Sequence, residues 1–97
     1  MRDVQAALKD WHRKRFPRTT LDDLGLKLAE EAGEVVGAIV RLNEIARRQR
    51  EGSDLEWRER LTDEIGDVAI VLLVLCARGG LDFEEVVADR AAEVMLR

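Results

Sequence analysis

Residues 53–80 read SDLEWRERLTDEIGDVAIVLLVLCARGG, and this stretch decides the fold class. Ser53 with Glu56 is the capping-box pattern that begins a helix. Gly79–Gly80 is a typical helix end. Together the two signals predict one long helix from about Asp54 to Arg78.

The same kind of pattern continues on both sides of this stretch. Three further helices are expected. The first runs from about Asp3 to Phe16 and is ended by Pro17, and a long second one runs from a Thr20–Asp23 capping box to near Gly52. The last begins at Asp82, with Glu85, and runs to the C-terminus. No segment shows the sustained alternation of apolar and polar residues that a sheet requires. The sequence therefore predicts an all-α fold, an antiparallel four-helix bundle, in one domain of residues 1–97.

Two features of the helices favour an oligomer. The run from Val68 to Ala77 is apolar on every face, and three partner helices in a chain of 97 residues supply little cover for such a helix. A domain of this size buries only about 60–65% of its unfolded surface. In addition, Ala29, Gly33 and Gly37 form a smooth stripe, which predicts a tight helix crossing. We expect a homodimer or a homotetramer.

Composition and charge exclude several classes of protein. The formal net charge is −4, whereas a protein that binds a nucleic-acid backbone normally has a basic face. The single cysteine, Cys76, forms no internal disulfide, which fits a reducing compartment. The N-terminus has charges where a secretory signal has an apolar core, and the longest apolar run is about half of the ~20 residues that span a bilayer. We expect a soluble cytoplasmic protein that binds neither nucleic acid nor membrane.

Two pairs of carboxylates point toward the expected core. With about 100° of rotation per residue, Glu64 lies about 20° from Val71 on the helix surface, and Asp67 lies between the lines of Val71 and Val74, about 40° from the first and about 20° from the second. On the preceding helix, Glu31 and Glu34 lie along the apolar stripe. Other acid pairs at this spacing are ordinary in a chain with 20 acidic residues. Direction, rather than spacing, distinguishes these four carboxylates.

Carboxylates in a core need cations. Burying an ionised carboxylate costs on the order of several kcal/mol unless it is paired. Lys27, four residues before Glu31, can reach only one of the four. A divalent metal ion resolves the conflict, and four oxygen ligands suit Mg²⁺ or Mn²⁺ rather than zinc. The alternative is that these acids form ion pairs with Lys or Arg on neighbouring helices.

These acidic residues resemble a family pattern. KLAEEAGE at residues 27–34, followed by DEIGDV at residues 63–68, resembles the EExxE and ExxD motifs of the MazG-like all-α nucleoside triphosphate pyrophosphohydrolases. The resemblance extends to residues 11–16 in the first helix and to the turn at residues 80–82. It covers most of the chain, and its motifs require two acid pairs on two helices in a fixed order.

The resemblance implies a role for each of several residues. The Mg²⁺ ligands would be Glu31, Glu34, Glu64 and Asp67, and a proton-accepting or water-positioning carboxylate would be Glu30 or Glu34. Phosphate contacts would come from Lys27 and Arg97. A stacking surface for the base would be formed by Trp11, His12 and Phe16. The other interpretation of the aromatic residues is a core Trp and Phe beside an exposed His. Many relatives have Lys and Asn ahead of the last Arg, where this chain has Arg90 and Val94.

The implied reaction splits a ribo- or deoxyribonucleoside triphosphate into a monophosphate and pyrophosphate, which would serve to clean the nucleotide pool. Three alternatives remain. A phosphoribosyl-ATP pyrophosphatase of histidine biosynthesis shares the acid pairs, although Gly33 and Gly66 look more MazG-like. A non-enzymatic helical interaction module would show no metal affinity. A ferritin-like di-iron protein needs Glu-x-x-His pairs, and the only histidine, His12, is not near the acids in sequence.

Overall fold

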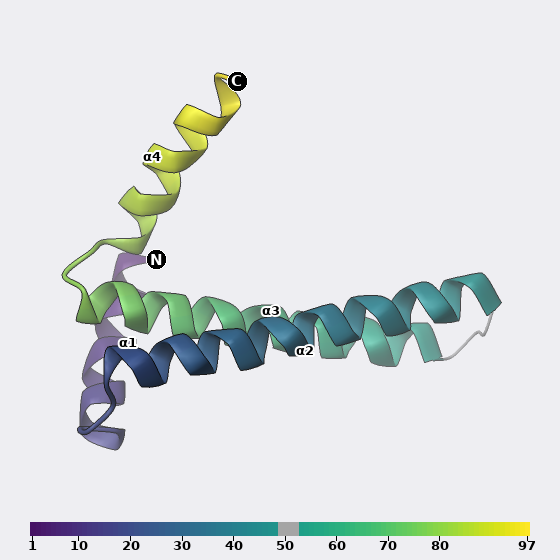
Figure 1. Cartoon of the computed structure of the whole chain (residues 1–97), viewed down its shortest axis with the longest axis horizontal. Helices are drawn as coiled ribbons and strands as arrows, with labels where there is room; N and C mark the ends of the chain where they lie inside the picture. The colour runs from purple at the N-terminus through teal and green to yellow at the C-terminus, as the bar shows by residue number, and fades with distance from the viewer. Residues whose placement is uncertain (49–52) are drawn as a thin grey trace.

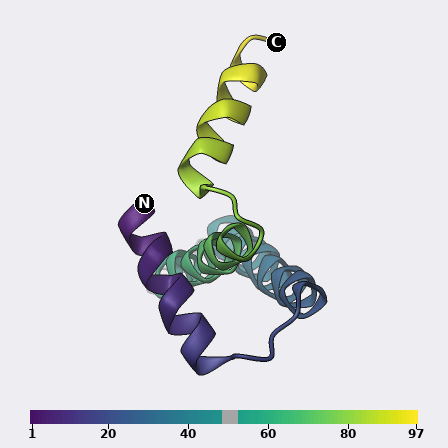
Figure 2. The ribbon, with the colours of Figure 1, turned by 90° about the vertical axis from the view of Figure 1, so that its left-hand side faces the viewer.

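The computed structural model describes residues 1–48 and 53–97, and this part of the chain is helical with no strand. The helices are α1 (Arg2–Arg15), α2 (Leu21–Arg48), α3 (Ser53–Arg78) and α4 (Phe83–Met95). The long helices α2 and α3 run in opposite directions, side by side (Figure 1). Helix α1 packs against α3 at the end of the pair where α3 ends, and α4 projects away from the pair (Figure 2).

The helix ends follow the capping signals of the sequence. The Thr20 hydroxyl accepts a hydrogen bond from the Asp23 N–H at 3.1 Å, and the Asp23 carboxylate accepts one from the Thr20 N–H at 2.9 Å. The Asp82 carboxylate likewise accepts from the Glu85 N–H at 3.2 Å. These two predicted N-termini are confirmed. The end expected near Gly52 lies outside the described residues.

The turn after α3 depends on a glycine. Gly80 has a φ of +71°, in the left-handed region that side chains with a Cβ disfavour. In this conformation the Leu81 N–H donates to the Cys76 carbonyl at 2.8 Å and the Gly80 N–H to the Ala77 carbonyl at 3.3 Å. This pair of bonds is the Schellman arrangement that satisfies the last carbonyls of a helix. The helix end predicted at Gly79–Gly80 is confirmed.

The core lies between α2 and α3 and is small. Its buried apolar residues are Leu24, Ala38, Val71, Leu73 and Val74. Within the run from Val68 to Ala77, only three side chains are buried, and Ile70 remains 41% exposed. One chain therefore leaves much of this apolar helix without cover.

The glycine stripe does not make the crossing that the sequence predicts. A Cβ placed on Gly33, Gly37 or Gly66 would meet no atom within 4 Å in the single chain. The prediction of a tight crossing at Gly33 and Gly37 is therefore wrong for one chain, because α3 packs on a different face of α2.

Helix α4 is joined to the rest of the molecule near its first turn. The Gln5 amide donates to the Leu81 carbonyl at 2.8 Å and accepts from the Phe83 N–H at 3.0 Å, so α1 holds the turn before α4. Beyond this turn α4 lies apart from α2 (Figures 1 and 2). A single chain therefore does not close a four-helix bundle. Within the described ranges, no helix combines the length and the hydropathy needed to cross a membrane.

Candidate metal centre

Three of the four predicted ligands meet where α2 and α3 face each other. Carboxylate oxygens of Glu31, Glu34 and Glu64 all lie within 4.8 Å of one another. Glu31 on α2 and Glu64 on α3 are only 7% and 8% exposed, whereas Glu34 is exposed at the rim. The helical rotation that placed these acids toward the core is confirmed for Glu31 and Glu64.

Each buried glutamate has one oxygen beside a cation and one without a partner. Lys27 Nζ lies 3.0 Å from Glu31 Oε1, and Arg60 Nε lies 3.8 Å from Glu64 Oε1. The Oε2 atoms of both glutamates are buried and accept no hydrogen bond in the described part of the chain. Ion pairs therefore do form at these acids, but the cations come from the same helix and leave the inner oxygens unsatisfied.

The negative charges of the cluster act on its outer members. The pKa of Glu34 is raised, first by the adjoining Glu64 side chain and then by the charges of Glu64 and Glu31. Asp67 lies outside the three-acid group, yet its pKa is also raised, first by burial and then by the charges of Glu31 and Glu64. Asp67 is thus an electrostatic neighbour of the cluster, but its side chain is exposed. Its predicted direction toward the core is therefore wrong, and its role as a metal ligand stays a prediction.

The donor set fits a hard divalent cation. A buried carboxylate oxygen without a partner costs about 1–3 kcal/mol or more, and the cluster contains two. Carboxylate oxygens from two helices are the ligands that Mg²⁺ and Mn²⁺ take, and the absence of a sulfur or imidazole donor from this cluster disfavours zinc. Glu31, Glu34 and Glu64 could hold such an ion, with Asp67 beside them.

The raised pKa values predict how pH changes the stability of the metal-free protein. Glu34 and Asp67 favour the protonated form when folded, so their contribution to stability is present below about pH 4 and is lost as pH rises through the raised pKa values. We expect the Mg²⁺-induced rise in melting temperature to be small near pH 4 and to grow toward pH 7. Melting followed by circular dichroism, with and without Mg²⁺, measures it. A shift that is independent of pH would contradict this linkage.

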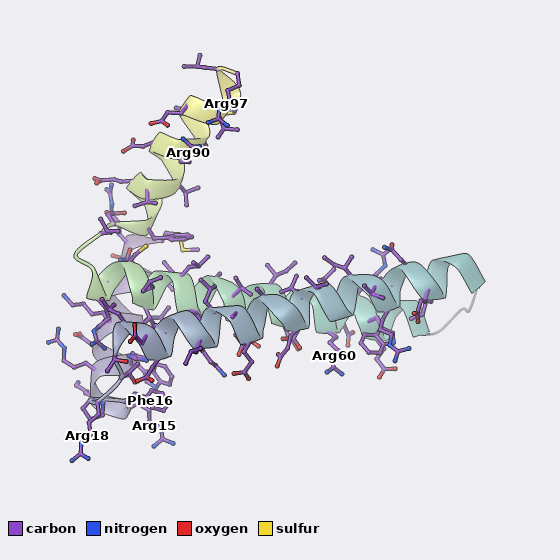
Figure 3. All side chains as sticks on the ribbon, viewed as in Figure 1. Arg15, Phe16, Arg18, Arg60, Arg90 and Arg97 are labelled. Carbon is purple, nitrogen blue, oxygen red and sulfur yellow. The ribbon has the colours of Figure 1, made fainter. Side chains whose placement is uncertain are left out.

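The remaining predicted residues differ in how near they lie to the acids. Glu30 is exposed and lies 3.6 Å from Lys27, so it belongs to the rim of the cluster. Arg97 lies at the far end of α4, and Figure 3 places it away from the α2–α3 pair. Within one chain, Arg97 is not brought to the acids.

The predicted aromatic residues form a cluster of their own at the end of α1. The ring centroids of Trp11 and Phe16 lie 5.8 Å apart, and those of His12 and Phe16 lie 5.3 Å apart. Trp11 is 52% and Phe16 45% exposed, while His12 is half-buried with a pKa lowered by burial and then by the charge of Arg78. The interpretation of a core Trp and Phe beside an exposed His is therefore wrong in the single chain.

Sequence reasoning did not single out Arg60 and Trp57. Arg60 Nε lies beside Glu64, and its guanidinium carbon lies 5.1 Å from the centroid of the Trp57 ring. Arg60 precedes Glu64 by four residues, as Lys27 precedes Glu31. That spacing is the signal that could have identified it, because side chains four apart are neighbours on a helix.

Two concave surfaces lie elsewhere, between α1 and the turn after α3. Cavities of about 410 and 430 Å³ share Lys9, Ala77 and Gly80 in their walls. Neither is lined by any of the four acids. The chemistry of the carboxylates therefore belongs to the cluster between α2 and α3 and not to these cavities.

Comparison with known proteins identifies the family. The family model of the MazG nucleotide pyrophosphohydrolase domain matches residues 19–94, a range that contains both acid pairs. Searches of curated proteins and of solved structures gave no match. Since the matched range spans most of the 97 residues, the chain belongs to the MazG nucleotide pyrophosphohydrolase family.

Proposed function

We propose that this protein is a Mg²⁺-dependent enzyme that hydrolyses ribo- or deoxyribonucleoside triphosphates to the monophosphate and pyrophosphate. The observation that carries the proposal is the pair of buried, unpartnered oxygens on Glu31 and Glu64, which lie within the range that the family model matches. An ion held there by Glu31, Glu34, Glu64 and Asp67 would satisfy those oxygens. Mn²⁺ has similar ligand preferences and is a suitable substitute.

The residues of the chain divide the work of the reaction. When bound, Mg²⁺ supplies positive charge that stabilises phosphate oxygens and makes water more acidic. Glu34 is exposed at the rim, beside the two buried glutamates, so it is placed to accept the proton of the attacking water. Glu30 is exposed on the same helix and is the second candidate for this role. Lys27 lies beside Glu30 and Glu31 and is positioned to contact a phosphate.

The aromatic cluster is the proposed surface for the base. Trp11 and Phe16 present exposed rings, and a nucleobase stacks on such rings with little dependence on its identity. His12 lies against Phe16 at the edge of this surface. If Arg97 contacts phosphate, the contact must come from another copy of the chain, because α4 carries it away from its own acids (Figure 3).

We also propose that the active protein is a homo-oligomer, either a dimer or a tetramer, in which helices of two chains complete the antiparallel bundle. An apolar groove of about 330 Å³ runs between α2 and α3, lined by Ala32, Val35, Ile65, Val68, Ala69 and Leu72. Burial of this groove by a second copy would cover apolar surface that one chain leaves open. Light scattering at micromolar concentration should give at least twice the mass of one chain, and a stable monomer would contradict the proposal.

A substrate panel tests the proposed activity. Ribo- and deoxyribonucleoside triphosphates and phosphoribosyl-ATP are incubated with Mg²⁺, and pyrophosphate is measured. We expect pyrophosphate from at least one nucleoside triphosphate, and no release after removal of the metal with a chelator. Turnover of phosphoribosyl-ATP alone would replace the proposed substrate class, and no pyrophosphate from any compound would contradict the activity.

A further inference from the structure

Lys27 and Arg60 occupy matching positions on the two helices of the cluster. Each precedes a buried glutamate by four residues, and each lies beside the Oε1 atom of that glutamate, at 3.0 Å from Glu31 and 3.8 Å from Glu64. Both cations are largely exposed, with side-chain exposures of 50% and 62%. The acids are thus flanked by one positive charge from α2 and one from α3, both at the solvent side.

Arg60 is held at this rim without using its hydrogen-bond donors. Its distance of 3.8 Å from Glu64 is an ion pair but too long for a hydrogen bond. The guanidinium lies over the Trp57 ring, 5.1 Å from the centroid, which restrains its direction. Figure 3 shows the side chain projecting outward from α3. In the described part of the chain no carbonyl or carboxylate takes its N–H groups, so they remain free to bind a ligand.

The charges of the site indicate which ligand these donors suit. A divalent ion between Glu31 and Glu64 would neutralise the carboxylates to which Lys27 and Arg60 are now paired. Arg60 would then have no anion of its own, and Lys27 would keep only its pair with the exposed Glu30, 3.6 Å away. An anion with several oxygens, bound at the metal ion, would restore the charge balance of the site. A phosphate chain has this chemistry, and the planar guanidinium binds two phosphate oxygens at once.

We infer that Arg60, together with Lys27, binds the phosphate chain of the substrate at the acidic cluster. The inference rests on the proposed function for the substrate class. It assigns to Arg60 a second role besides its ion pair, since in the metal-free protein the guanidinium is the counter-ion of Glu64. Arg60 therefore competes with the metal ion for Glu64, but it binds the phosphate chain together with the metal ion.

Titration calorimetry on the full chain tests this double role with Arg60→Gln. The variant should bind Mg²⁺ alone about two- to fivefold more tightly, because a competing surface ion pair is removed. With Mg²⁺ saturating, it should bind pyrophosphate at least about tenfold more weakly, because a charge-assisted contact is lost. Arg60→Lys should recover part of the pyrophosphate affinity, since it keeps the charge without the planar fork. Arg41→Gln is the control, because Arg41 is 61% exposed and has a similar intrahelical pair with Glu44.

Three outcomes would overturn the inference. In the first, Arg60→Gln leaves the pyrophosphate affinity unchanged. In the second, Arg60→Gln weakens the binding of both Mg²⁺ and pyrophosphate, which would mean that Arg60 only positions the acids. In the third, the wild type with Mg²⁺ does not bind pyrophosphate. Failure of the proposed function looks different. In that case the wild type would bind Mg²⁺ and pyrophosphate, and Arg60→Gln would weaken pyrophosphate binding as expected, but no nucleoside triphosphate would be turned over.

Discussion

Glu64→Gln is expected to lower turnover by at least about 100-fold and to remove most of the thermal stabilisation by Mg²⁺, with the helical content unchanged. The Oε2 atom of Glu64 is buried without a partner, and its charge acts on both Glu34 and Asp67. Glutamine keeps the shape of the side chain but removes this charge. The metal-free variant should therefore melt at the same temperature as the wild type or higher, while its response to Mg²⁺ is lost. Pyrophosphate release and melting curves measure the two effects.

Asp67→Asn should also lower both turnover and the thermal stabilisation by Mg²⁺, because the charges of the same two buried glutamates act on Asp67. Glu59→Gln is the matched control, since Glu59 is an exposed acid on the same helix and outside the cluster. This control should keep both activity and the Mg²⁺ response. If Glu64→Gln and Asp67→Asn respond to Mg²⁺ as the wild type does, the acids are structural and the proposed metal centre is wrong.

The sequence predicted the helices well because their ends are encoded locally. Thr20, Asp23 and Asp82 make the hydrogen bonds that their capping patterns require, and Gly80 adopts the positive φ that ends α3. Such signals depend on residues only three or four positions apart. The direction of Glu31 and Glu64 toward the core was predictable for a similar reason, because it follows from helical rotation and the apolar residues on the same face.

The arrangement of the helices was harder to predict. The pattern of apolar residues indicates that α3 needs cover on all sides, but it does not say which chain provides the cover. In the structure α4 leaves the α2–α3 pair after the turn that Gln5 holds, and the Gly33–Gly37 stripe faces open space. These features depend on contacts between residues far apart in sequence, and the pattern within a single helix contains no information on them.

The acidic cluster was predicted in part. Their direction on the helix surface identified the carboxylates, but it did not identify which oxygens are satisfied, because that depends on the rotamers of Lys27 and Arg60. The pairing of Lys27 with Glu31 was expected, whereas its counterpart on α3 was not, although Arg60 stands at the same spacing from Glu64. The stacking of Arg60 on Trp57 arises from the folded helix surface and makes the second cation recognisable.

The bond that breaks is the sharpest test of the proposed activity. The acids come from two facing helices and present their oxygens together, so an ion held there would bind the phosphate chain from one side. In the proposed reaction, water attacks the α-phosphorus and pyrophosphate leaves as a unit. In ¹⁸O-labelled water, we expect the label in the nucleoside monophosphate and none in the pyrophosphate. Mass spectrometry of both products after one turnover measures the distribution.

Each other labelling pattern assigns a different reaction. Labelled orthophosphate with a nucleoside diphosphate would mean attack at the γ-phosphorus, and the protein would be a phosphohydrolase of another kind. Label in pyrophosphate would mean attack at the β-phosphorus, which the proposal excludes. A reaction of the metal-free protein, run with a chelator, provides the background exchange. Either contrary pattern would leave the acidic cluster and its affinity for Mg²⁺ intact, because those depend on Glu31 and Glu64 and not on the phosphorus that water attacks.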